Sequence, residues 1–285
     1  TDLPYDQREE DGGALVFDSP ILDEPLEILG APVLKLLLSS DKPVAMVAAR
    51  LSNIAPSGAV TRVTYGLLNL THRDDHANPQ ELEPNQRYTV QIQLNHVAQR
   101  FPAGHRIRMA ISTSYWPLAW PAPESPQVTL YTSGSHLELP IRRPQELDNN
   151  LRDLGEPDGD KPLDTTMLAP AHREWKVTHN LASNEVMLDV VNNDAYYRIN
   201  DYDLALQKDV TERYSYKNNN YDTVRGEVES TRSLQRGDWF IKSVTRTVLT
   251  STRTHFRIRA TLDAYEGDTR VFSKSWDESV PRVKV

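Results

Sequence analysis

Apolar and polar residues alternate with a period of two along most of residues 1–143, which is the pattern of strands with one buried face. In the stretch 106–112, for example, Ile107, Met109 and Ile111 alternate with polar residues. Similar stretches, together with a run at 44–52 that is apolar on both faces as in a central strand, predict about eight strands, at 14–17, 26–40, 44–52, 60–70, 88–94, 106–112, 128–130 and 137–141. No stretch keeps an apolar stripe at the helical period. This half is therefore predicted to be an all-β sandwich, with a jelly roll as the favoured arrangement.

The pattern changes after residue 143. Residues 144–171 combine scattered apolar residues with many turn formers, and we interpret them as a linker. Long β patterns return over 172–285, and the last of them are joined by short connections such as Glu266-Gly267-Asp268. Strands in series with short connections predict an antiparallel β-meander or sandwich. We therefore expect two all-β domains, at 1–143 and 172–285.

Charge is spread unevenly along the 285 residues, whose formal net charge is −8. The part before His172 carries 23 Asp/Glu against 14 Lys/Arg, and the rest carries 17 against 18. An acidic first half argues against wrapping nucleic acid, which needs clustered positive charge. No apolar run approaches the length of a membrane-spanning helix. Neither nucleic acid nor a membrane is therefore expected as a partner.

The sequence contains no cysteine, which excludes disulfides, thiolate zinc sites and a cysteine nucleophile. Such a composition suits a reducing compartment, so we expect a cytoplasmic location. The chain begins Thr1-Asp2-Leu3-Pro4, without an initiator Met or the basic and apolar regions of a signal peptide. It starts as though cut from a linker, and we expect it to be a fragment.

Catalytic and metal-binding signatures are weak. The Gly-x-Ser-x-Gly turn of α/β-type serine hydrolases is absent, and Ser133-Gly134-Ser135 is interpreted as a hairpin turn between two strands. His72 and His76 could share a helix face as metal ligands, but they lie in a polar loop that ends in Asn78-Pro79. We interpret this segment as a solvated loop, and we expect no catalytic residue, metal or cofactor.

The strand at 106–112 runs into a loop, 115–121, that is too rich in proline to continue a sheet. Tyr115, Trp116 and Trp120 in this loop are the candidate binding residues. Three interpretations compete: packing beneath the loop, docking against another protein surface, and stacking on a sugar ring. Stacking on a sugar needs a planar aromatic flanked by Asp, Asn or Arg donors, whereas prolines flank these aromatics. That difference favours docking over sugar binding.

Four pieces in order carry a resemblance to a known family: Asp6-Gln7-Arg8, the run 22–30 (LDEPLEILG), the run 101–108 (FPAGHRIR), and 111–114 (ISTS) with its following aromatic. With these pieces, residues 1–143 resemble the C-terminal non-catalytic domain of X-prolyl dipeptidyl peptidases and cocaine-esterase-like (CocE/NonD) serine hydrolases. Many relatives have Asn-Phe-Pro where this chain has Tyr115-Trp116-Pro117, which leaves the contacts of that position open. Residues 172–285 resemble no family that we can name.

The resemblance implies a galactose-binding-like jelly roll that packs on an α/β-hydrolase domain earlier in the chain. The family's Ser, Asp and His belong to that earlier domain, so none is carried over to this sequence. The implied function is that of a non-catalytic C-terminal region of a serine hydrolase, a dipeptidyl-peptidase or an acyl-esterase, which buttresses the hydrolase domain and lines its substrate entrance. Two alternatives remain, an independent carbohydrate-binding module and a structural unit that forms a homodimer.

Overall fold

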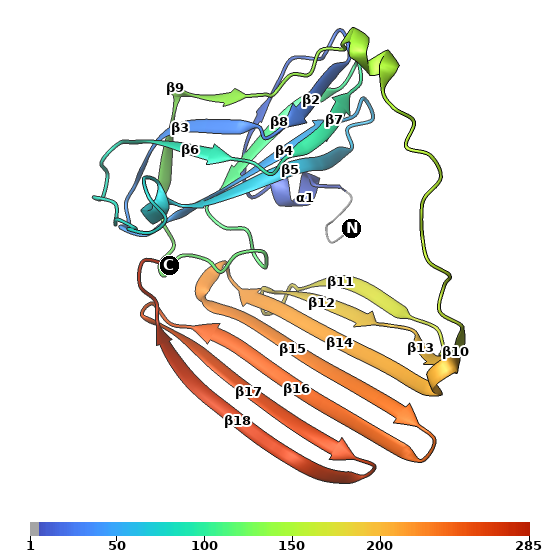
Figure 1. Cartoon of the computed structure of the whole chain (residues 1–285). Helices are drawn as coiled ribbons and strands as arrows, with labels where there is room; N and C mark the ends of the chain where they lie inside the picture. Colours follow the sequence, from blue (N-terminus) through green and yellow to red (C-terminus); the bar gives the residue numbers. More distant parts are fainter. Residues whose placement is uncertain (1–5) are drawn as a thin grey trace. The chain divides into compact units, whose positions relative to one another are not determined.

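The computed structural model describes residues 6–285, so the linker-like start at Thr1–Pro4 lies outside the described residues. The described chain divides into two compact units, residues 6–153 with 284–285 and residues 154–283. Strands dominate both units (Figure 1), and the one α-helix of the described residues, α1 (Arg8–Asp11), has four residues. None of the described helices has the length and apolar character needed to cross a membrane. The predicted all-β class is confirmed.

The first unit is a β-sandwich built from antiparallel strands (Figure 1). One sheet has the strand order β1-β8-β4-β5, another has the order β6-β3-β9, and β2 pairs with β7. The strands are β1 (Leu15–Asp18), β2 (Leu26–Gly30), β3 (Val33–Ser40), β4 (Met46–Ile54), β5 (Val60–Asn69), β6 (Tyr88–Gln93), β7 (Val97–Phe101), β8 (Arg106–Ser112) and β9 (Val128–Glu138). A jelly-roll arrangement of these strands stays a prediction.

One hydrophobic core joins the sheets of the first unit. The alternating set on β8 that the sequence indicates is buried, since Ile107, Met109 and Ile111 are each at most 7% exposed. Leu36 and Phe101, which are 2% and 0% exposed, contribute to the same cluster from β3 and β7. The core therefore fixes β8 and with it the start of the aromatic loop that follows.

The expected hairpin at Ser133-Gly134-Ser135 is wrong, because β9 continues through it as a single strand. The pairing of β9 with β3 shifts in register opposite Leu37, so residues 132–135 form a bulge. Ser135 Oγ accepts a hydrogen bond from Leu37 N (3.0 Å) and donates one to Tyr131 O (2.9 Å). A Cβ on Gly134 would lie 2.8 Å from Leu37 Cδ2, so the bulge packs closely against β3.

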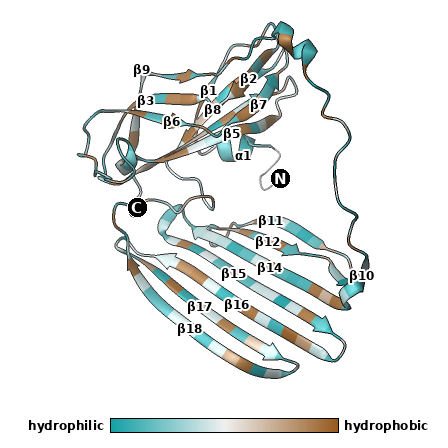
Figure 2. Cartoon of the chain, viewed as in Figure 1, coloured by the Kyte–Doolittle hydropathy of each residue, from teal (hydrophilic) through white to brown (hydrophobic). Residues whose placement is uncertain are grey.

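The second unit is one nine-stranded antiparallel sheet. Its last five strands, β14 to β18, pair in sequence order, so the predicted meander is confirmed. The strands are β10 (Thr165–Ala169), β11 (His172–Asn180), β12 (Glu185–Asn193), β13 (Tyr196–Ile199), β14 (Leu204–Lys217), β15 (Asn220–Arg236), β16 (Trp239–Ser251), β17 (His255–Glu266) and β18 (Thr269–Pro281). Figure 2 shows hydrophobic and hydrophilic residues alternating along these strands.

Three short 3-10 helices complete the described chain: η1 (Leu70–His72), η2 (Glu146–Asn150) and η3 (Asn200–Tyr202). Residues 151–164 form no helix or strand, and their side chains are exposed. The helix η2 and the strand β10 lie at either side of this exposed stretch, within the segment 144–171 that we interpret as a linker. The domain limits at residues 143 and 172 stay a prediction.

Candidate functional site

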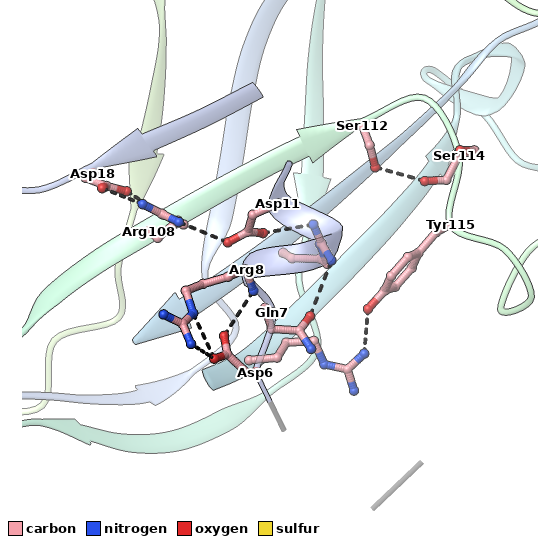
Figure 3. Close-up of polar contacts among 11 residues, drawn as sticks. Asp6, Gln7, Arg8, Asp11, Asp18, Arg108, Ser112, Ser114 and Tyr115 are labelled. Atoms are coloured by element: carbon pink, nitrogen blue, oxygen red, sulfur yellow. Dashed lines mark hydrogen bonds and ion pairs between the residues drawn. The ribbon is translucent and has the colours of Figure 1, made fainter. Parts of the chain in front are cut away.

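The aromatic loop begins directly after β8, and residues 113–127 contain no strand, as the prolines predict. Its first aromatic, Tyr115, is tied to the neighbouring strand β5. Arg62 Nη1 donates a hydrogen bond of 2.6 Å to Tyr115 Oη (Figure 3). The ring of Tyr115 also meets the ring of Tyr65 in an edge contact, with the centroids 5.5 Å apart. Tyr115 therefore anchors the loop to the sandwich.

The other two candidate residues form a pair within the loop. The rings of Trp116 and Trp120 lie edge to face, with centroids 4.9 Å apart and planes at 89°. Both side chains are half-buried, and Leu118 between them is 48% exposed. The structure thus turns Tyr115 towards β5 and pairs the two tryptophans with each other. The loop presents a partly exposed apolar surface on an anchored backbone.

A buried arginine on β4 supports the loop from beneath. Arg50 Nη2 donates to Asp11 Oδ1 at 2.9 Å, and its Nη1 donates to Gln7 Oε1 at 3.3 Å. The Arg50 side chain is only 4% exposed, and so is that of Asp11. The guanidinium carbon of Arg50 also lies 5.7 Å from the ring centroid of Tyr115. This one side chain therefore contacts both the N-terminal helix α1 and the aromatic loop.

Asp11 is shared between two arginines, because its second oxygen accepts from Arg108 Nη1 on β8 at 3.2 Å. Arg108 also donates to both oxygens of Asp18, at 2.7 and 2.8 Å, in a bidentate pair (Figure 3). These hydrogen bonds hold the pKa of Asp18 below its usual value. The chain Arg50–Asp11–Arg108–Asp18 fixes α1 and β1 onto the sheet.

Sequence reasoning missed this network. It noticed Gln7 only as part of the motif Asp6-Gln7-Arg8, and Arg108 only as part of the run 101–108. The available signal was Arg50, the one charged residue in the otherwise apolar run 46–51. A charge in a central strand is buried only when it is paired, so a carboxylate partner could have been expected from elsewhere in the chain.

The described side chains offer no catalytic arrangement at the serines or histidines that the sequence highlights. Ser135 Oγ bonds Leu37 N and Tyr131 O, so backbone groups occupy it. The rings of His72 and His76 lie 5.5 Å apart, but a search of the described residues finds no group of three side chains that could hold a metal ion. What the first unit does present is an anchored aromatic surface, which suits binding.

Comparison with known proteins gives a match over the first unit. The family model of the X-Pro dipeptidyl-peptidase C-terminal non-catalytic domain matches residues 2–149. Over 116 residues the chain is 28% identical to cocaine esterase of Rhodococcus sp. (strain MB1 Bresler). The aligned region covers 40% of this chain and 20% of the esterase.

Two solved structures are similar to about half of the chain. An α-amino acid ester hydrolase is 24% identical with a TM-score of 0.46, over 48% of this chain and 27% of the hydrolase. An aminopeptidase from the marine sediment archaeon Thaumarchaeota archaeon is 22% identical with a TM-score of 0.46, over the same shares of the two chains. The matched part is therefore between a fifth and about a quarter of the length of these relatives.

Proposed function

The chain belongs to the family of X-Pro dipeptidyl-peptidase C-terminal non-catalytic domains, and on this premise we propose that it serves an α/β-hydrolase domain of the same full-length protein. In this proposal the parent protein is a serine hydrolase of the CocE/NonD type, either a dipeptidyl-peptidase or an acyl-esterase. The first unit buttresses the hydrolase domain, and the aromatic loop docks against it beside the substrate entrance. The family description and the esterase relative support the class of parent enzyme.

The observation that carries the docking role is the anchored state of the aromatic loop. The Arg62–Tyr115 hydrogen bond and the edge contact with Tyr65 restrict the loop before any partner binds. A surface that is already ordered loses little conformational entropy on binding, and aromatic side chains contribute strongly to interface energies. Leu118, 48% exposed at the middle of the loop, adds apolar area to the same surface.

The geometry of the tryptophans disfavours the carbohydrate-binding alternative. A sugar ring stacks on an open aromatic face, whereas Trp116 and Trp120 use the edge of one ring and the face of the other for their own contact. Two half-buried rings at right angles also present no common plane. A protein surface can accommodate such an uneven apolar ridge, so docking remains the interpretation that the loop supports best.

The test is to replace Trp116 or Trp120 by Ala in the full-length hydrolase and to measure kcat/KM. Loss of an aromatic anchor from an interface costs about 1–3 kcal/mol. If docking supports the substrate site, we expect kcat/KM to fall by about 5- to 150-fold.

The matched control is Trp276→Ala, which removes a half-buried tryptophan from β18 of the second unit and should leave kcat/KM within about twofold of the parent. Unchanged kcat/KM in both loop variants would contradict the docking role. Sugar binding that disappears in the same two variants would support the carbohydrate-binding alternative instead.

A further inference from the structure

The two faces of the large sheet in the second unit differ in polarity. Residues that pair directly across neighbouring strands point to the same face. One such row runs through Leu206, Leu234 and Ile241 on β14, β15 and β16. The next row on the same face, two residues along, pairs Lys208 with Arg232. An apolar row thus lies beside a basic pair on one face of the sheet.

A cavity of about 900 Å³ is formed on this face. Its lining comes from the connection between β12 and β13 and from β13 to β18, and it includes the apolar row. Trp239 contributes an aromatic ring that is 44% exposed. Tyr197 on β13 lies in register with Leu206 and closes the opposite side. Sites for small organic ligands have volumes of roughly 300–1,000 Å³ and mostly apolar walls with a few polar groups. The cavity has both properties.

The positive charges of Lys208 and Arg232 at the cavity are not neutralised by the carboxylates near them. Lys208 and Arg232 are directly opposite each other on adjacent strands, where like charges destabilise a sheet. Lys208 Nζ has one carboxylate near it, Asp194 Oδ2 at 3.9 Å, which is at the limit of an ion pair. Arg232 is exposed and has no ion pair within the described chain. An anion placed between the two cations would relieve their repulsion.

The carboxylates that line the cavity do not neutralise the basic pair. Asp194 also faces Arg173, at 3.8 Å from its guanidinium, so its charge is divided between two cations. Glu266 lies in register with Ile241 on β17, two strands away from Arg232. Two strand spacings alone are roughly 10 Å, so its carboxylate is remote from the basic pair. The cavity is therefore cationic at one end and apolar along its floor.

We propose that this cavity binds an amphipathic carboxylate, such as a medium-chain acyl acid. The carboxylate accepts hydrogen bonds from Lys208 and Arg232, and the apolar chain lies over the row from Leu206 to Ile241 towards Trp239. Charge-assisted hydrogen bonds to a guanidinium set the orientation, and apolar contact supplies most of the affinity. The site lies beyond the part of the chain that matches the family model, and it does not depend on the proposed function of the first unit.

The test uses the 285-residue chain and the fluorescent anion 1-anilinonaphthalene-8-sulfonate as a reporter, displaced by dodecanoate or by the uncharged 1-dodecanol. Dodecanoate should displace the reporter at concentrations about tenfold lower than dodecanol, because only the carboxylate can bond to the basic pair. Arg232→Gln should reduce this preference for the carboxylate several-fold, because only Lys208 of the basic pair then remains. Trp239→Ala should weaken displacement by both compounds, because both use the apolar floor.

Two matched controls distinguish binding at this site from non-specific binding elsewhere on the sheet. Arg257 on β17 is an exposed arginine on the opposite face, and Trp175 on β11 is 47% exposed but outside the cavity. Arg257→Gln and Trp175→Ala should leave dodecanoate binding unchanged.

Equal displacement by acid and alcohol, or an equal effect of Trp175→Ala and Trp239→Ala, would overturn the proposal. Light scattering on the same samples covers the remaining alternative: a dimer whose formation abolishes reporter binding would show that a second copy covers this face, and would also overturn it.

Discussion

Removing the carboxylate of Asp11 should destabilise the first unit far more than removing that of Asp18, although both bind Arg108. Asp11 and its second partner, Arg50, have side chains that are each 4% exposed. Asp11→Ala therefore leaves a buried guanidinium without its carboxylate. In Asp18→Ala, by contrast, the affected side chain of Arg108 is 18% exposed and can be solvated in part.

These exposures determine how much unfolding free energy each variant should lose. Breaking a buried ion pair by removing one partner costs about 3–5 kcal/mol, because the remaining charge stays desolvated. A pair closer to the surface contributes about 1 kcal/mol or less. The double variant Asp11→Leu with Arg50→Met removes both buried charges, and it should recover most of the loss, since apolar replacements of buried pairs are often neutral.

Native-state hydrogen exchange of peptides from β4 and β8 measures the free energy of unfolding of the first unit without interference from the second. We expect Asp11→Ala to lower this free energy by about 3–5 kcal/mol. A loss below about 1 kcal/mol, equal to that of Asp18→Ala, would refute the reasoning, since it would mean that water reaches Arg50. A double variant as unstable as Asp11→Ala would also contradict it.

Three further predictions concern acid stability, packing and catalysis. Arg108 holds the pKa of Asp18 below its usual value, so the stabilisation from this pair is complete above about pH 4 and is lost as the pH falls further. In Asp18→Asn the Tm should therefore fall less steeply with decreasing pH than in the parent protein. Gly66→Ala should cost about 1–3 kcal/mol in urea unfolding, because its Cβ would lie 2.8 Å from Gln93 O, whereas Gly159→Ala, with no atom within 4 Å, should be neutral. The 285-residue chain alone should not be labelled covalently by a fluorophosphonate probe, and labelling abolished by replacing one serine would contradict this.

Period-two alternation predicted most strands of the first unit because its core selects one face of each strand, but it missed β7 (Val97–Phe101) and merged β2 with β3. On β8 the residues expected inside, such as Met109, are buried. The method failed at residues 132–135, where Gly and Ser residues form a bulge within β9 and not a turn between strands. Turn-forming residues are common to both structures, and only the pairing partner Leu37 decides between them.

The role of the candidate binding residues stays a prediction, and the sequence did not indicate the contacts that hold them. The loop with Tyr115, Trp116 and Trp120 was recognisable because prolines interrupt a strand pattern. Its anchor, Arg62, is 53 residues away in sequence, and the Arg50–Asp11 pair joins residues that are 39 apart. Such contacts follow from the register of β4, β5 and β8 in one sheet, which a single sequence does not specify.

The docking of the aromatic loop is the central claim, and hydrogen–deuterium exchange tests it directly. Exchange should be compared between the 285-residue chain alone and the full-length protein that carries the hydrolase domain. The account predicts slower exchange in residues 113–121 in the full-length protein, since docking excludes water from the loop backbone, with no change in the exposed segment 151–164. Identical exchange of residues 113–121 in the two proteins would contradict the claim.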